Sequence, residues 1–194
     1  MKRSLVAILV SVAFSQAAPA ALKAGDMAPD FSAQASLAGK AFSFSLTDAL
    51  KTGPVVVYFY PSAFTEGCNI QAHTFSVRKS EFDAAGATII GVSLDSITRL
   101  NDFSADPKYC AGNISVASDA DGKIAKAYNL QVQTAPQPVQ DSRGVTIDHA
   151  FAERTTFIVT PDHKVSATIG GVTPTANVDQ ALKAVQQLAN ARAK

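Results

Sequence analysis

Residues 54–60 form a short apolar run rich in Val, Tyr and Phe, with a Gly-Pro pair at its start and Pro61 directly after it. Such a run between turn residues predicts a strand buried on both faces. From residue 65 to Gly86 apolar residues then recur at helical spacing, interrupted only by Lys79. The residues that share this helix face are Cys68, Ala72, Phe75 and Phe82. A strand followed directly by a helix therefore begins the most regular part of the chain.

The rest of the chain keeps alternating between strand-like and helix-like segments. Apolar β-branched runs predict strands at residues 87–94, 114–117, 155–160 and 164–169, the last two joined by a tight turn. Helical patterns predict helices at residues 96–105 and 122–128, and a last one that begins between 173 and 177. Residues after Leu130 include Pro136, Pro138 and Gly144, have no period and predict a long surface loop. This order predicts one α/β domain with a mixed central sheet and helices on both faces.

The first twenty residues have the layout of an export signal. Two basic residues precede an uncharged apolar run at residues 5–14, which is about half the length of a membrane-spanning helix. Ala18-Pro19-Ala20 then offers a small-residue cleavage site. We expect a signal peptide over residues 1–20 and an exported domain over residues 21–194, periplasmic or secreted and without a membrane anchor. Cleavage three residues earlier and an uncleaved anchor are the alternatives.

Charge and composition exclude some partners. The chain has 17 Lys and Arg against 16 Asp and Glu, a formal net charge of +1, and no long run of like charges. It therefore lacks the basic surface with which proteins hold nucleic acid, and we expect no nucleic-acid partner. With 47% hydrophobic and 17% charged residues, it has the composition of a folded domain.

The chain contains two cysteines, Cys68 and Cys110. In an exported protein the first interpretation of two cysteines is one structural disulfide, although a domain of this length can bury a core without one. Cys68 falls in the first turn of the predicted helix, just after Pro61 ends the predicted strand. A thiol with the ordinary pKa of about 8.5 is about 3% ionised at pH 7, and one with a pKa of about 6 is about 90% ionised. A helix N-terminus and a cation from elsewhere in the chain can together supply that difference.

The pattern Pro61-x-x-x-Thr65-x-x-Cys68 after a strand resembles the active-site motif of the peroxiredoxins, the alkyl hydroperoxide reductase and thiol-specific antioxidant family. Three further segments resemble the same family in the same order: GDMAPDF at 25–31, GVSLDS at 91–96 and RTTFIV at 154–159. The resemblance is nearest to the Q-type, or bacterioferritin-comigratory-like, subfamily. It implies a thioredoxin-like fold and a thiol-dependent peroxidase that reduces hydrogen peroxide and organic hydroperoxides.

The resemblance also implies a role for each matched residue. Cys68 is expected to be the peroxidatic cysteine, which attacks the peroxide and becomes a sulfenic acid. Thr65 is expected to hydrogen-bond the substrate oxygen, and Pro61 to shield the site from water. Arg154 is expected to hold the thiolate and to stabilise the charge that develops on the leaving oxygen.

Two positions depart from the subfamily pattern. Q-type members often carry a resolving cysteine five residues after the first, where this chain has His73, which we expect to be a solvated residue on the helix surface. The resemblance then implies that Cys110 resolves Cys68 through a redox disulfide, after local unfolding of the helix start. A buried inert Cys110 and a one-cysteine enzyme resolved by an outside thiol remain open. Position 66 is Glu, where the subfamily often has proline, and a carboxylate beside a thiol disfavours the thiolate.

No metal and no cofactor are expected. Asp119-x-Asp121-Gly122 lacks the later ligands of a calcium loop and predicts a turn between strand and helix. As partners the resemblance implies a peroxide substrate and an external thiol reductant, either thioredoxin-like or a small thiol, with the protein a monomer or a homodimer. Two other functions stay open: a thiol-disulfide oxidoreductase, against which the absence of Cys-x-x-Cys counts, and a non-catalytic secreted domain with a structural disulfide.

Overall fold

The computed structural model describes residues 20–192, so the predicted signal peptide, apart from Ala20, lies outside the described residues. The strands are β1 (Ser32–Leu37), β2 (Lys40–Ser45), β3 (Val55–Phe59), β4 (Thr88–Ser93), β5 (Ser115–Ser118), β6 (Val132–Gln133), β7 (Phe151–Ala152), β8 (Thr155–Val159) and β9 (Val165–Gly170). The helices are α1 (Leu46–Leu50), α2 (Glu66–Val77), α3 (Lys79–Ala84), α4 (Ile97–Ala105), α5 (Lys123–Ala127) and α6 (Pro174–Arg192).

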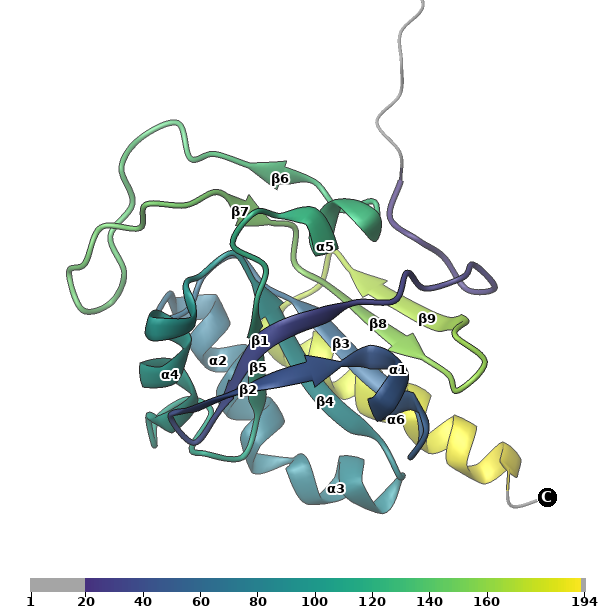
Figure 1. Ribbon diagram of the computed structural model, residues 1–194. Helices are drawn as coiled ribbons and strands as arrows, with labels where there is room; N and C mark the ends of the chain where they lie inside the picture. The colour runs from purple at the N-terminus through teal and green to yellow at the C-terminus, as the bar shows by residue number, and fades with distance from the viewer. Residues whose placement is uncertain (1–19, 193–194) are drawn as a thin grey trace, which may run out of the picture.

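Seven strands form one sheet in the order β2-β1-β5-β4-β3-β8-β9 (Figure 1). The three strands β3, β4 and β5 run parallel, whereas β8 pairs antiparallel with β3 and β9 antiparallel with β8. The sheet is therefore mixed, as predicted.

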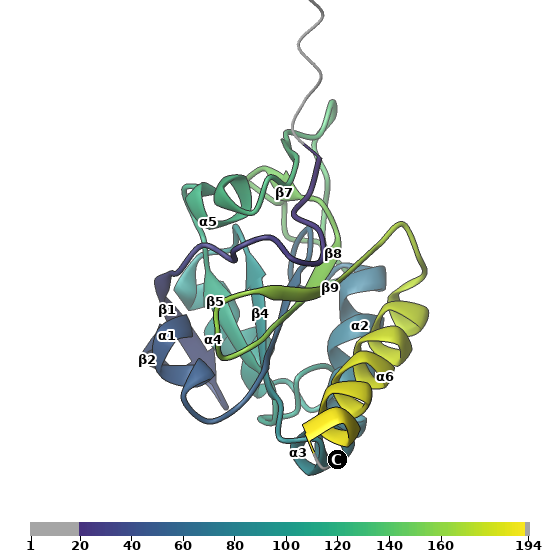
Figure 2. The same ribbon diagram turned by 90° about the vertical axis from the view of Figure 1, so that its right-hand side faces the viewer.

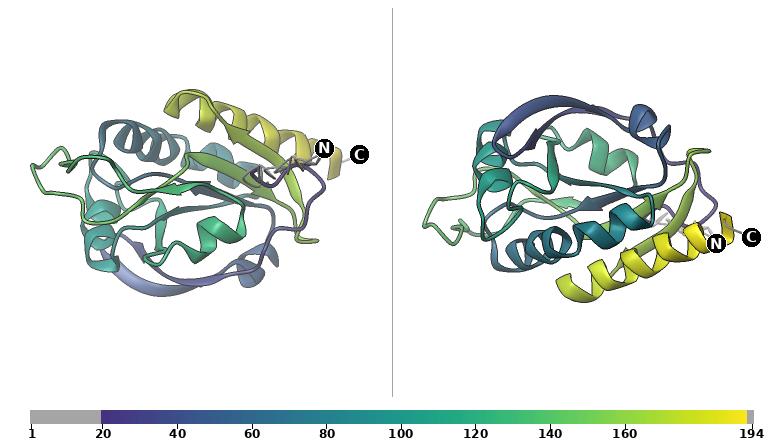
Figure 3. Two further views of the ribbon diagram at one scale, coloured as in Figure 1. Left: turned by 90° about the horizontal axis from the view of Figure 1, so that it is seen from above. Right: turned by 90° about the horizontal axis from the view of Figure 1, so that it is seen from below.

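Helices cover both faces of this sheet, which confirms the predicted layers. The five residues of β3 are buried, and alternate side chains enter two separate apolar clusters. Val56 and Tyr58 enter the cluster that also contains residues of α2, α3, α4 and α6, and Val57 enters the one with residues of α1 and α5. Helix α6 runs alongside α2 on one face (Figures 2 and 3).

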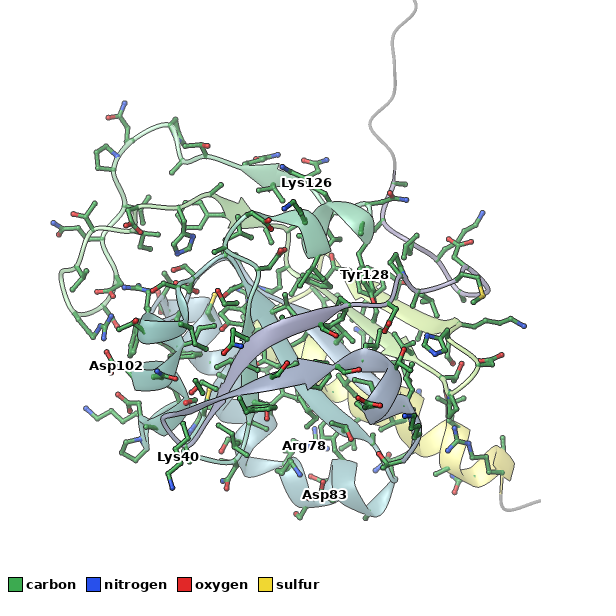
Figure 4. All side chains as sticks on the ribbon, in the orientation of Figure 1. Lys40, Arg78, Asp83, Asp102, Lys126 and Tyr128 are labelled. Atoms are coloured by element: carbon green, nitrogen blue, oxygen red, sulfur yellow. The ribbon has the colours of Figure 1, made fainter. Side chains whose placement is uncertain are left out.

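The single helix predicted over residues 65–86 is wrong in one respect, because it is two helices that meet at Arg78. Arg78 leaves helical geometry, with φ −100° and ψ 7°, and it ends α2 and precedes α3. Its guanidinium pairs with Glu81 in α3 and with Asp179 in α6, and Figure 4 shows it at the start of α3, near Asp83. The interruption of the apolar pattern at Lys79 marks this break.

The long loop predicted after Leu130 is also only partly right. Its two ends form a small antiparallel sheet, β6 with β7, outside the seven-stranded sheet. The residues between, 134–150, project from one side of the molecule (Figures 1 and 3). We call residues 134–150 the long loop.

Two smaller expectations can be compared with the structure. His73 is exposed on α2, as predicted. Asp119 forms the turn between β5 and α5, where its carboxylate accepts hydrogen bonds from the amides of Ile124 and Ala125. Among residues 20–192 no helix is long and apolar enough to cross a bilayer, and no three His, Cys, Asp or Glu side chains are grouped as metal ligands.

Candidate active site

Cys68 is the third residue of α2, and its side chain is 1% exposed. Strand β3 ends at Phe59, the chain turns at Pro61, and Thr65 occupies the N-cap position of the helix. Thr65 makes no side-chain capping hydrogen bond, so the cap does not satisfy the amides of the first turn, which have no intrahelical acceptor. The positive end of the helix dipole therefore lies next to the sulfur.

Arg154, which the family resemblance implies holds the thiolate, lies beside Cys68 in the structure. It directly precedes β8, whose first residue Thr155 pairs with Phe59 at the end of β3, so the strand register carries Arg154 to the site. Its Nη2 donates a hydrogen bond to Cys68 Sγ over 3.3 Å. Gly67 leaves room for this approach, because a Cβ at that position would lie 3.1 Å from Nη2. The guanidinium and the helix N-terminus both favour a negative charge on the sulfur.

Pro61 and Thr65 both lie in the turn between β3 and α2, which precedes Cys68. The hydroxyl of Thr65 donates to the carbonyl oxygen of Ser62 at 2.8 Å, so towards any ligand it can only accept a hydrogen bond. Pro61 and Arg154 line a cavity of about 500 Å³ together with residues in and beside β6 and β7 and the first residues of the long loop. These other lining residues are Gln131, Gln133, Thr134, Ala135, Pro136, Phe151, Ala152 and Glu153, and neither Cys68 nor Thr65 is among them.

Cys110 lies in the turn that follows α4, is fully buried and belongs to the same apolar cluster as Cys68. Both cysteines are free thiols. Burial, with a smaller effect of the Asp106 charge, raises the pKa of the Cys110 thiol far above its ordinary value. In this conformation Cys110 is therefore a neutral thiol rather than a nucleophile.

A network of buried polar groups holds the turn between β3 and α2. Asp95, which is fully buried, accepts hydrogen bonds from Ser62 Oγ at 2.9 Å and from the amide of Ala63 at 2.8 Å. Phe64 in the same turn has φ +62°, a left-handed conformation that is uncommon for a residue with a side chain. Arg99 donates to both Asp95 and the carbonyl of Ala63, each at 2.8 Å.

The long loop is fastened to the same turn. His149 Nε2 lies 2.8 Å from Asp95 Oδ1. Asp141 forms an ion pair with Arg99, in which Oδ2 lies 2.8 Å from Nη2. The guanidinium of Arg143 lies 3.3 Å from the centroid of the Phe64 ring, a cation–π contact. Residues 95–99 and the long loop thus both hold the turn that precedes Cys68.

Sequence reasoning missed the polar residues around the site. Asp95 falls within the matched GVSLDS segment, which gave it no role, and His149 and Asp141 lie in the segment that carries no periodic signal. Gln71 is placed one helical turn after Cys68, where its amide oxygen accepts a hydrogen bond from Arg154. The spacing of three residues from Cys68 is a signal that could have found it.

Comparisons with known proteins show to which family the chain is similar. The AhpC/TSA family profile matches residues 24–168. The bcp protein of Helicobacter pylori strain J99 is 36% identical over 107 residues, 55% of this chain and 66% of that protein. Peroxiredoxin Bcp of Xanthomonas campestris is 30% identical over 111 residues, 57% of this chain and 62% of that protein. The aligned part is just under two thirds of each of these relatives.

Solved structures are similar over most of the chain. The crystal structure of peroxidoxin BcpB from Mycobacterium tuberculosis has a TM-score of 0.71 and 27% identity, and the match covers 86% of this chain and 97% of that one. A structure of peroxiredoxin Q from Xanthomonas campestris has a TM-score of 0.64 and 27% identity, with 80% and 90% covered.

Proposed function

The chain belongs to the AhpC/TSA family as a peroxiredoxin of the Q type, and from that premise we propose that it is a thiol-dependent peroxidase whose peroxidatic residue is Cys68. The observation that carries this proposal is the 3.3 Å contact between Arg154 Nη2 and Cys68 Sγ at the start of α2. A helix N-terminus and a guanidinium converge there on one buried sulfur. Thiolates are the reactive form of cysteine, and a guanidinium that donates to the sulfur stabilises the negative charge of a thiolate.

The reaction is a nucleophilic displacement at the peroxide. The Cys68 thiolate attacks the terminal oxygen of a hydroperoxide, the S–O bond forms and the O–O bond breaks. Sulfur is oxidised to the sulfenic acid, and the leaving oxygen takes a proton and departs as water or an alcohol. Arg154 is adjacent to the reacting sulfur and stabilises the charge that develops on the oxygens.

Thr65 is proposed to hydrogen-bond the peroxide, and Pro61 to shield the site from water. Because the Thr65 hydroxyl donates to Ser62, its lone pairs are left to accept a hydrogen bond from the O–H of the substrate. The substrate enters through the cavity beside Pro61 and Arg154, whose volume of about 500 Å³ is large enough for hydrogen peroxide or a small organic hydroperoxide.

We propose that Cys110 resolves the sulfenic acid. Its thiol displaces the hydroxyl group of the sulfenic acid, which leaves as water while the Cys68–Cys110 disulfide forms. Cys110 is buried, so this step requires the start of α2 to unfold locally. An external thiol, thioredoxin-like or small, then reduces the disulfide. If Cys110 stays in place, the same external thiol attacks the sulfenic acid directly.

The cellular setting follows from the leader alone. We propose that residues 1–20 are a signal peptide and that the mature domain works outside the cytoplasm, as a monomer or homodimer.

The two other functions, a non-catalytic domain with a structural disulfide and a thiol-disulfide oxidoreductase, are less well supported. Both cysteines are free, which does not favour a structural disulfide, and Cys68 is followed by Asn69, Ile70 and Gln71 rather than by a second thiol three residues on.

The intact mass of the reduced protein after one equivalent of hydrogen peroxide at neutral pH tests the proposal. A loss of about two daltons with no free thiol left supports attack by Cys68 and resolution by Cys110. A gain of about sixteen daltons localised to Cys68 supports a one-cysteine peroxidase. A Cys68→Ser variant should show neither change, and an unchanged wild-type mass after minutes would refute the peroxidase.

A further inference from the structure

A chain of buried hydrogen bonds continues from Arg154 away from Cys68. Arg154 uses Nη2 for the sulfur and Nη1 for Gln71 Oε1, so one guanidinium bridges both residues of α2. The other end of the Gln71 amide, Nε2, donates to Asn177 Oδ1 in α6 over 2.9 Å. Gln71 and Asn177 are both fully buried, so neither amide can turn to water for a substitute partner.

Asn177 joins three elements around the site. Its Oδ1 also accepts a hydrogen bond from Thr156 Oγ1 of β8 at 2.6 Å, and its Nδ2 donates to the carbonyl oxygen of Ile169 in β9 at 3.0 Å. Each polar atom of this side chain is thereby satisfied.

The groups at the two ends of this series of hydrogen bonds, the Ile169 carbonyl and the Arg154 guanidinium, fix the orientation of both amides. The carbonyl of Ile169 can only accept, so Asn177 must turn its NH₂ group towards it and present Oδ1 to Gln71. Gln71 then turns its own NH₂ group to Asn177 and its oxygen to Arg154, which can only donate. A flip of either amide would bring two donors or two acceptors together in a buried place.

We infer that Asn177 is a positioning residue for the peroxidase reaction: it sets the orientation of the Gln71 amide, and through it the place of the Arg154 guanidinium against Cys68. Gln71 is neutral, so Arg154 is oriented by a dipole and keeps its full charge for the sulfur. No salt bridge found within residues 20–192 involves Arg154, so no carboxylate there neutralises its charge. The inference rests on the proposed function, in which Arg154 and the Cys68 thiolate act together.

The test compares Asn177→Leu, which has a similar size but no polar atoms, with Asn177→Asp. Two quantities are measured: the pH profile of Cys68 alkylation by iodoacetamide, localised by peptide mass, and kcat/KM for hydrogen peroxide. We expect Asn177→Leu to move the alkylation profile by about half a pH unit or more to higher pH and to lower kcat/KM about tenfold. Asn177→Asp keeps an acceptor for Gln71 but turns its second oxygen to the Ile169 carbonyl, so it should lower thermal stability and yet move the alkylation profile less than Asn177→Leu does.

Two further variants distinguish an effect on the orientation of the Gln71 amide from a general loss of stability. Thr156→Val removes another partner of Asn177 but leaves Gln71 untouched, so it should lower thermal stability without moving the alkylation profile. Gln71→Met should reproduce Asn177→Leu, and the double variant should add nothing to either single change, because both act through one contact. Gln71→Met also keeps the test available if Asn177→Leu does not fold.

The inference is overturned if a folded Asn177→Leu variant has the wild-type profile and the wild-type kcat/KM, or if Thr156→Val moves the profile as far as Asn177→Leu does. Alkylation needs no peroxide turnover. A wild-type protein that fails to consume peroxide would therefore refute the proposed function and still leave the effect of Asn177 on Cys68 measurable.

Discussion

His149 Nε2 lies 2.8 Å from Asp95 Oδ1, and this contact joins the long loop to the turn that precedes Cys68. The other ring nitrogen, Nδ1, lies 2.8 Å from the carbonyl oxygen of Ala150, which can only accept. Both nitrogens therefore donate when the ring is protonated, and the charged imidazolium fits this place best.

The pair makes the stability of the fold depend on pH. Burial lowers the pKa of His149, but hydrogen bonds to Asp95 and Ala150 raise it above the ordinary 6.5 overall, against a small opposing effect of Arg99. Burial raises the pKa of Asp95, and the contacts with His149, Ala63 and Ser93 lower it below the ordinary 3.8 overall. The contribution of His149 to the free energy of unfolding is complete below about pH 6.5 and is lost as pH rises through its folded-state pKa. The contribution of Asp95 is complete above about pH 3.8 and is lost as pH falls through its folded-state pKa.

We therefore expect His149→Gln to destabilise the protein most between about pH 4 and 6.5, by about 1–2 kcal/mol, with a smaller loss once the pH exceeds the raised folded-state pKa of His149. Urea unfolding at several pH values measures this. His73→Gln, on the exposed face of α2, is the matched control and should show no such pH dependence. An equal loss for His149→Gln at every pH would mean that the ring acts by packing alone.

Lysine is expected not to replace Arg154 in the reaction. Lysine keeps the charge, but its single ammonium lacks the planar fork that contacts Cys68 and Gln71 together. We expect Arg154→Lys to lower kcat/KM for hydrogen peroxide about a hundredfold, with little change in thermal stability. Arg78→Lys, at the break between α2 and α3, is the control and should retain activity. Full activity of Arg154→Lys would show that charge alone suffices.

Gly67 offers a prediction in which stability and activity change in opposite directions. Alanine is the better helix former by up to about 1 kcal/mol, so Gly67→Ala should raise the melting temperature. Its Cβ would lie 3.1 Å from Arg154 Nη2, however, so the guanidinium that contacts the sulfur has to shift by a few tenths of an ångström. Because a small misplacement of a catalytic group slows a reaction strongly, we expect kcat/KM to fall about tenfold. Stopped-flow kinetics with hydrogen peroxide and a thermal melt test both halves, and a variant that is as fast as the wild type would show that Arg154 has room to move.

The elements that carry the motif could be predicted because their residues have a strong periodic signal. The apolar run of β3 and the helical stripe of α2 each follow from hydrophobic spacing, and the Pro-Thr-Cys pattern falls where they join. The hairpin of β1 and β2 has little such signal. Its residues are mostly small or polar, and most side chains of β2 are exposed, so nothing in the sequence distinguishes it from a loop.

The polar surroundings of the site could not be predicted for a different reason. Gln71 and Asn177 are 106 residues apart in the chain and meet only because α2 and α6 pack side by side. A buried amide in an otherwise ordinary helix looks like a surface residue until its partner is known. Asp95 and His149 are separated in the same way. Sequence patterns report local periodicity, and these contacts depend on tertiary structure.

Asp141 provides the last prediction, because it fastens the long loop to the turn before Cys68. Its carboxylate is buried, pairs with Arg99 at 2.8 Å and accepts hydrogen bonds from the amides of Arg143 and Val145. If Cys110 reaches Cys68 only after the start of α2 unfolds, contacts that hold this turn must slow the formation of the disulfide.

We expect Asp141→Asn to speed amide exchange over residues 65–72 about tenfold or more in the reduced protein, because it weakens the ion pair with Arg99. After a pulse of peroxide, the variant should form the Cys68–Cys110 disulfide faster and accumulate less sulfinic acid, since resolution competes with further oxidation. Asp102→Asn is the matched control: this exposed carboxylate lies on α4, 3.9 Å from Arg143, and its loss should change neither rate (Figure 4). Exchange that is identical over residues 65–72 in the reduced and disulfide forms of the wild type would show that Cys110 resolves Cys68 without unfolding the start of α2.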